Sequence, residues 1–126
     1  MDRKQLTREY KESARPMGVY RVRNLHTGAS LVGRSVDLPA VLNRERAQLK
    51  LNAHRNTALQ RDWNTLGPDA FAFEVLDTIT RPADQPDHDP ADDLKVLEAL
   101  WLDRLRPWEG GGYMKAPRAS SPAAGG

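Results

Sequence analysis

The chain has 126 residues, enough for one hydrophobic core but not for two, which excludes the enzyme classes that need several hundred residues. Hydrophobic residues make up 39% and charged residues 29%, as in an ordinary soluble globular domain. Because the chain has no cysteine, disulfides, thiolate nucleophiles and cysteine-based metal sites are excluded. No apolar run approaches the length of a membrane span, and the charged N-terminus is unlike a secretory signal, so we expect a cytoplasmic protein with no membrane partner.

The net charge of +2 conceals a basic half and an acidic half. Residues 1–62 carry 13 Lys and Arg against 6 Asp and Glu, whereas residues 63–126 carry 6 against 11. The basic half is where a polyanion such as nucleic acid would bind. The alternative is that the two halves pack against each other and their fields cancel.

The first part of the chain predicts a short helix followed by a β-hairpin. Residues 2–14 are mostly good helix formers, and Pro16 ends that helix. Residues 19–23 follow as a strand, and residues 24–28 form a turn that ends in glycine. Residues 29–33 then form the second strand of the hairpin.

Two helices and a third strand are expected next. Asp37 is a suitable N-cap for a helix with Pro39 in its first turn, and this helix continues to Leu49 and Leu51 with one buried stripe. A second helix covers residues 56–66 and ends at the following glycine. Residues 71–79 are apolar with a period of two, which predicts a third strand that we expect at the centre of the sheet.

The last part of the chain predicts a loop, a helix and a tail. Asp89 is expected to be the N-cap of the helix and Pro90 its first residue, and Pro107 ends it. The aspartates around residues 84–93 superficially resemble metal ligands but are better explained by an irregular loop and a helix start. The expected apolar face of the helix consists of Leu94, Leu97, Trp101, Leu102 and Leu105.

These elements predict an α+β domain at residues 16–114, built on a small three-stranded antiparallel sheet flanked by helices. We expect an extra N-terminal helix within residues 1–15. Residues 115–126 are rich in Ala, Pro, Ser and Gly, which predicts a disordered C-terminal tail.

Several short motifs, in order along the chain, resemble the GIY-YIG nuclease superfamily. Gly18, Val19 and Tyr20, followed about a dozen residues later by Leu31-Val32-Gly33, are similar to the paired signature of that family. The resemblance continues through residues 33–38, 59–67, 71–76 and 97–102. It implies metal-dependent hydrolysis of nucleic-acid phosphodiester bonds, with DNA as the expected partner and Mg²⁺ or Mn²⁺ as the cofactor.

The resemblance also implies which residues act, and where this chain departs from the family. Tyr20 matches the first motif tyrosine, and Glu98 matches the glutamate that holds the metal. The other polar positions of the family are changed: the second tyrosine falls on Leu31, the helix arginine on Val41, the histidine on Glu45 and the asparagine on Met114. Because loss of a transition-state cation costs orders of magnitude in rate, the resemblance implies weak cleavage.

Two arginines are candidates for the missing cation. Arg44 is three residues after Val41 on the same helix, and Arg34 directly follows Gly33. The alternative is that both are solvated or contact phosphate without a catalytic role. If Glu45 and Glu98 lie within reach of one cation, the two carboxylates would form an altered metal site, in which Glu45 supplies an oxygen ligand in place of the histidine.

Three functions therefore stay open. The first is a weak metal-dependent endonuclease. The second is an inactive nucleic-acid-binding module, and the third is a protein-interaction or self-association domain. The nucleic-acid-binding residues expected for the first two are Arg21, Arg23, Arg34, Arg44, Arg46 and Lys50. His26 and His54 are expected to be surface polar residues.

Overall fold

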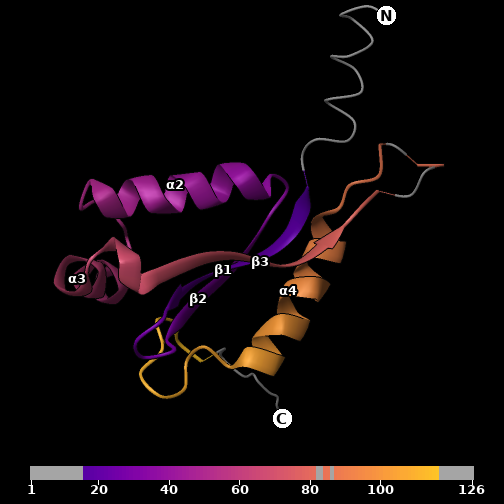
Figure 1. The fold of residues 1–126 in the computed structure, drawn as a ribbon. Helices are drawn as coiled ribbons and strands as arrows, with labels where there is room; N and C mark the ends of the chain where they lie inside the picture. The colour runs from indigo at the N-terminus through magenta and orange to yellow at the C-terminus, as the bar shows by residue number, and fades with distance from the viewer. Residues whose placement is uncertain (1–15, 82–83, 86, 117–126) are drawn as a thin grey trace, which may run out of the picture.

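The computed structural model of the protein describes residues 16–81, 84–85 and 87–116 (Figure 1). The expected N-terminal helix and all but the first two residues of the expected tail lie outside the described residues. The elements are β1 (Met17–Asn24), β2 (Ser30–Ser35), α2 (Leu38–Lys50), α3 (Thr57–Leu66), the short 3₁₀ turn η1 (Pro68–Ala70), β3 (Phe71–Ile79) and α4 (Ala91–Leu105).

The three strands form one antiparallel sheet in the order β2-β1-β3. The α+β class and the three-stranded antiparallel sheet are therefore confirmed, but β3 is an edge strand and β1 is the central one. The central position expected for β3 was wrong, because apolar alternation shows only that one face of a strand is packed and does not show how many strands lie beside it. The central strand β1 carries two arginines, and Glu74 of β3 neutralises them by pairing with Arg21 and Arg23.

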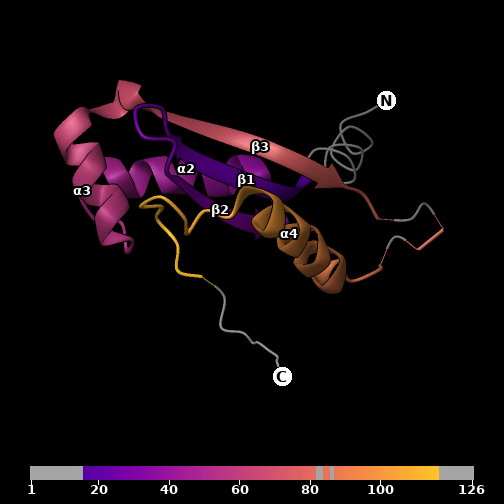
Figure 2. The same ribbon diagram turned by 90° about the horizontal axis from the view of Figure 1, so that it is seen from below.

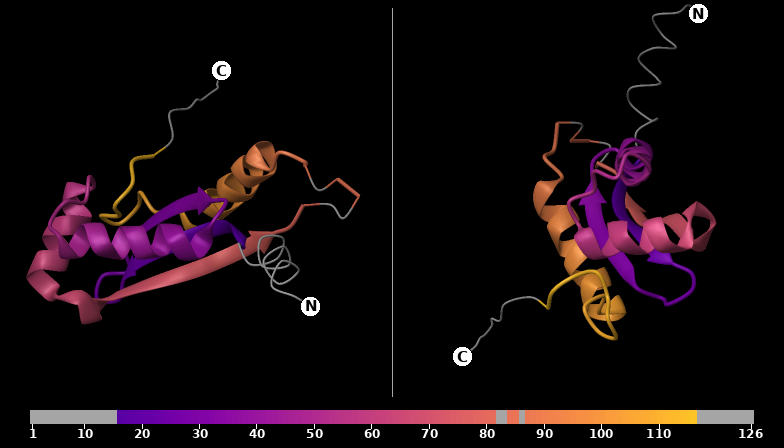
Figure 3. Two further views of the ribbon diagram at one scale, coloured as in Figure 1. Left: turned by 90° about the horizontal axis from the view of Figure 1, so that it is seen from above. Right: turned by 90° about the vertical axis from the view of Figure 1, so that its left-hand side faces the viewer.

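The helices lie on both faces of the sheet. Helices α2 and α3 lie on one face, and α4 lies on the other, as the views from below and from above show (Figures 2 and 3). One core cluster, between the sheet and the ends of α2 and α3, includes Val22, Leu59 and Trp63. A second, smaller cluster is formed by Tyr20 and two residues of α2, Leu38 and Val41. Because the first cluster also contains Leu49 of α2, both clusters lie on the same face of the sheet.

Local signals set the ends of the helices as expected. Asp37 caps α2 by accepting a hydrogen bond of 3.1 Å from the Ala40 N–H, and Asn56 caps α3 in the same way at Leu59 N, 3.0 Å. Gly67, with a φ of 90°, ends α3. Residue Leu51 follows α2 and is 76% exposed, so it does not extend the buried stripe.

Helix α4 is much more exposed than its sequence suggests. Leu94 is its one buried residue, whereas Val96 and Leu100 are 62% and 61% exposed. The other four residues of the expected apolar face are half-buried. A three-stranded sheet is too narrow to cover the whole stripe. Helix α4 packs mainly against β1 and β2, and it contacts β3 through a hydrogen bond of 3.2 Å from Trp101 Nε1 to Asp77. None of the described helices is both long and apolar enough to cross a membrane.

Candidate active site

Tyr20 extends from the central strand across the neighbouring strand at Gly33. The register pairs these two residues, and a Cβ at Gly33 would lie only 2.6 Å from the Tyr20 hydroxyl oxygen and 2.7 Å from its Cζ. The glycine therefore provides the space for the ring. Because β2 is an edge strand, the Tyr20 hydroxyl points toward this edge of the sheet.

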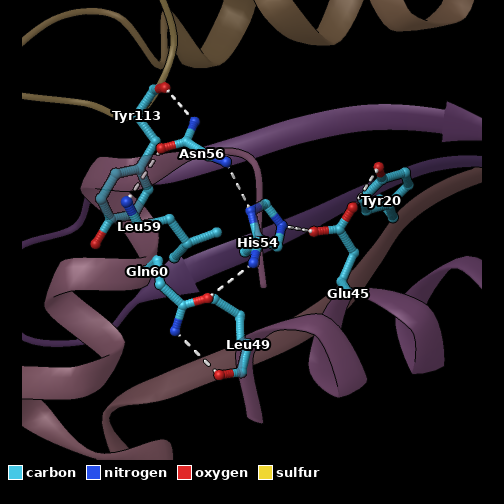
Figure 4. Close-up of polar contacts among 8 residues, drawn as sticks. All are labelled: Tyr20, Glu45, Leu49, His54, Asn56, Leu59, Gln60 and Tyr113. Atoms are coloured by element: carbon cyan, nitrogen blue, oxygen red, sulfur yellow. Dashed lines mark hydrogen bonds and ion pairs between the residues drawn. The ribbon is translucent and has the colours of Figure 1, made fainter. Parts of the chain in front are cut away.

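A buried carboxylate lies beside the Tyr20 hydroxyl (Figure 4). Glu45, on the sheet-facing side of α2, is 3% exposed. Its Oε2 accepts a hydrogen bond of 3.3 Å from Tyr20, long for this type of bond, and its Oε1 lies 2.5 Å from His54 Nε2. The three side chains thus form a continuous hydrogen-bonded chain.

His54 is buried, in contrast to the surface position expected for it. The connection between α2 and α3 is held inward by Gln60, which accepts from the His54 N–H at 3.0 Å and donates to the Leu49 carbonyl at 3.0 Å. The sequence could not reveal this because the polar partners come from neighbouring helices.

The hydrogen bonds of His54 determine which ring nitrogen carries the proton. The Asn56 backbone N–H donates to Nδ1 at 3.0 Å, so Nδ1 is an acceptor. The proton of the neutral ring is therefore on Nε2, where it is donated to Glu45. The hydrogen-bond network thus aligns His54 as a donor to the carboxylate.

The surroundings of Tyr20 strongly favour its protonated form. Burial raises the pKa of the Tyr20 hydroxyl to about 12, and the charge and hydrogen bond of Glu45 act in the same direction. The positive charges of Arg55 and Arg44 oppose the shift. At neutral pH Tyr20 is therefore a phenol that can donate a proton.

Two arginines on the α2 side bring positive charge to Tyr20. Val41, where the family has arginine, is buried in the core beside Tyr20. Arg44, an expected substitute, and Arg55, which sequence reasoning missed, both act electrostatically on the Tyr20 hydroxyl. In the sequence, the one indication of a role for Arg55 is that it directly follows His54. That indication is useful only once the structure shows that His54 is buried.

The expected metal ligand, Glu98, approaches β2 from the opposite face of the sheet. Its Oε1 forms an ion pair with Nη1 of Arg34, the residue after Gly33. Side chains alternate along a strand, so Gly33 faces Tyr20 and Arg34 faces α4. Tyr20 and the Arg34–Glu98 pair therefore reach the same edge of the sheet from its two sides.

The possibility that Glu45 and Glu98 share one cation finds no support in their contacts. Both oxygens of Glu45 are engaged on the α2 side, and Glu98 pairs with Arg34. Within the part of the chain that the structure describes, no group of three or more His, Cys, Asp or Glu side chains could hold a metal ion. This also applies to the described aspartates of the loop before α4.

The other expected nucleic-acid-binding residues do not form one continuous face. Arg21 and Arg23 are on the α4 side of the sheet and both pair with Glu74, at 2.7 Å. Arg46 and Lys50 instead line a basic-aromatic groove on the α2 side, near β3 and away from Tyr20. This groove is lined by Arg46, Lys50, Trp63, Pro68, Asp69, Phe71 and Phe73.

The segment after α4 returns to the hairpin. The Met114 sulfur, at the position of the family's asparagine, accepts a hydrogen bond of 3.3 Å from the Val32 N–H of β2. Next to it, the Tyr113 hydroxyl accepts from Asn24 at 3.0 Å and donates to Asp62 at 2.7 Å. The two residues therefore fasten the segment after α4 to the sheet and to α3.

Comparison with known proteins identifies the fold. A scan against protein-family models finds no match, and a search of curated proteins finds no relative. Two solved structures are similar. A mutant of the catalytic domain of the intron endonuclease I-TevI is 23% identical, with 80% of this chain and 94% of that chain covered and a TM-score of 0.64. The catalytic domain of the homing endonuclease I-TevI is 24% identical, with 80% and 99% covered and a TM-score of 0.63. I-TevI is a GIY-YIG homing endonuclease, so the chain has the GIY-YIG-like fold expected from its motifs.

Proposed function

We propose that this chain is a metal-dependent nuclease that hydrolyses phosphodiester bonds in nucleic acid, with DNA as the preferred substrate. The observation that carries the proposal is that Tyr20 and the Arg34–Glu98 pair reach one edge of a nuclease-like sheet from its two faces. A phosphodiester at this edge would contact groups from both faces of the sheet.

The residues of this edge match the needs of the reaction. Hydrolysis places negative charge on the phosphoryl oxygens in the transition state, and preorganised positive charge stabilises it. Arg44 and Arg55 supply that charge on the Tyr20 side. The Tyr20 hydroxyl orients the attacking water. With Val41 in place of the family's arginine, the exposed Arg44 and Arg55 are less rigidly held, and we expect slow turnover.

Glu98 fits a Mg²⁺ or Mn²⁺ ion that keeps most of its water ligands. Its side chain is 17% exposed, and no described residue forms a hydrogen bond with its second oxygen, Oε2. Mg²⁺ is commonly bound through one or two carboxylates together with substrate phosphate oxygens. When bound, the ion would polarise the phosphate. Glu98 would hold it, and Arg34 would keep the carboxylate oriented.

A cleavage assay tests the proposal. The purified chain is incubated with labelled single-stranded, duplex and branched DNA and with RNA, in Mg²⁺, in Mn²⁺ or in chelator. We expect cleavage only with metal and its loss in Glu98→Gln. The matched control is Glu109→Gln, which removes another Glu–Arg pair, to Arg106, outside the site. Absence of cleavage on every substrate contradicts the proposal, and cleavage that survives Glu98→Gln contradicts the assignment of Glu98.

A nucleic-acid-binding module without catalysis is the second candidate. It is favoured by the ion pair that already occupies Glu98 and by the groove that contains Arg46 and Lys50. In this case we expect salt-sensitive binding to nucleic acid without cleavage. Neutralising both groove residues would weaken that binding, whereas Glu98→Gln would leave it unchanged.

A further inference from the structure

Glu45 is a buried acid that the proposed roles of Tyr20, Arg34 and Glu98 do not use. It lies on the buried stripe of α2, whose other buried members, Leu38, Val41 and Leu49, are all apolar. Among the described residues no Lys or Arg forms an ion pair with it. Burying a carboxylate is unfavourable unless hydrogen bonds compensate the lost hydration, and the donors that do this for Glu45 are Tyr20 and His54.

Tyr20 needs a proton acceptor if it is to take a proton from water. Because burial and Glu45 raise the pKa of its hydroxyl to about 12, the phenolate is scarce at neutral pH. Taking a proton on the phenol oxygen therefore requires the existing proton to leave. The Glu45 oxygen Oε2, at 3.3 Å, is the acceptor in contact with that hydroxyl among the described residues.

We propose that Glu45 acts behind Tyr20 as the final acceptor of the proton from the attacking water, with His54 holding the carboxylate in position. The inference rests on the proposed nuclease function. His54 donates from Nε2 to Oε1, which leaves Oε2 facing the tyrosine. With its side chain 4% exposed, Glu45 does not touch substrate, so it is a positioning residue that acts through Tyr20.

The proton transfers balance the hydrolysis. As the water oxygen bonds to phosphorus, one of its protons passes to the Tyr20 oxygen, and the Tyr20 proton passes to Oε2 of Glu45. The bond between phosphorus and the leaving sugar oxygen breaks, and that oxygen takes a proton from solvent. Glu45 then returns its proton to solvent through Tyr20. The products are a phosphomonoester and an alcohol, and the enzyme regains its starting state.

The decisive variant is Glu45→Gln, which keeps the size of the side chain but removes the base. We expect kcat to fall about 100-fold or more with little change in KM, as for loss of a general base. The rate of this variant should then rise about tenfold per pH unit above neutrality, because only ionised Tyr20 can act. The wild type should lack this rise. The charged groups that act on Tyr20 are Glu45, Arg44 and Arg55.

A second readout follows Tyr20 directly and needs no activity. Carbon-13 NMR of the tyrosine Cζ should report a Tyr20 pKa near 12 in the wild type and a lower value in Glu45→Gln. The matched control is Asp62→Asn, which removes a carboxylate bonded to another tyrosine, Tyr113, at 2.7 Å. This control should lower the pKa of Tyr113, which burial above all and Asp62 raise to about 12, without changing kcat.

The outcomes separate this inference from the proposed function. If the wild type cleaves and Glu45→Gln cleaves at a similar rate, the inference is overturned and the nuclease function stands. If the wild type cleaves no substrate with metal, both are overturned. If Glu45→Gln does not fold, the wild-type titration decides: a Tyr20 pKa at or below about 10, the ordinary tyrosine value, overturns the inference, because the carboxylate of Glu45 would then not act on the hydroxyl.

Discussion

The close approach of Tyr20 to Gly33 predicts a large effect for a small substitution, Gly33→Ala. The new Cβ would lie 2.6 Å from the Tyr20 hydroxyl oxygen, 2.7 Å from Cζ and 2.9 Å from Cε1. Ordinary contacts between such atoms are about 3.5 Å, so the ring must retreat by roughly 1 Å. That movement would also disturb the 3.3 Å hydrogen bond to Glu45.

Two opposing terms set the size of this effect. Overpacking a core costs about 1–3 kcal/mol. Gly33 does not have a positive φ, so alanine by itself would stabilise by about 0.4–1 kcal/mol through the unfolded state. We therefore expect the free energy of unfolding to fall by up to about 2.6 kcal/mol. At roughly 4–8 °C per kcal/mol for a domain of about 100 residues, Tm should fall by up to roughly 20 °C.

Urea unfolding followed by circular dichroism measures this change. The control is the same substitution in a Tyr20→Leu background, because leucine lacks the three atoms that the Cβ would meet. There Gly33→Ala should be neutral or stabilising, which reverses the sign of the effect. An equal loss of stability in both backgrounds would refute the explanation by the tyrosine ring.

Three further predictions concern stability and binding. Asn24→Ala should lower the free energy of unfolding, measured by urea denaturation, by about 2 kcal/mol, because the fully buried side chain accepts hydrogen bonds from two backbone N–H groups of the hairpin turn. A loss below about 0.5 kcal/mol would contradict this explanation. Burial by itself would raise the pKa of the Glu74 carboxyl, but the two arginines of β1 outweigh this effect and hold the pKa below its usual range. The stabilisation from Glu74 is therefore present above the pKa of the unfolded chain, and it is lost as the pH falls through the lower pKa of the folded state. Glu74→Gln should thus cost less than about 1 kcal/mol at pH 7 and nothing in strong acid, as acid-titrated thermal unfolding would show. Neutralising Arg46 and Lys50 together should reduce the slope of log DNA affinity against log salt concentration by the equivalent of about two phosphate contacts. An unchanged slope would show that the groove does not bind DNA.

The secondary structure was predictable because its signals are local. The Asp37 and Asn56 caps, the glycine after α3 and the apolar periods each involve residues within a few positions of one another. Helix α4 begins one residue later than expected, after Pro90, but Asp89 still accepts the Ala91 N–H at 3.0 Å. The motifs from Tyr20 and Gly33 to residues 97–102, taken together and in order, also indicated the fold that the solved structures share.

The candidate site was predictable only in part. Tyr20 and Glu98 follow from the motifs, but the chain from Tyr20 through Glu45 to His54 joins residues 25 and 9 positions apart. Glu45 resembled a simple loss of the family's histidine, and the structure instead gives it two buried donors. The exposure of the apolar residues on α4 could not be predicted either, because the sequence does not show how much of an apolar helix face a three-stranded sheet will cover.

The sequence by itself determined the type and order of the described helices and strands, their ends to within about two residues, and which signature residues they carry. Only the tertiary structure decided that β1 is the central strand, that His54 turns inward and that Arg34 pairs with Glu98 on the face of the sheet opposite Tyr20. The physical reason is that caps, turns and periodicity depend on neighbours in the chain. Strand order, burial of polar groups and the protonation of Tyr20 depend instead on what the whole fold packs together.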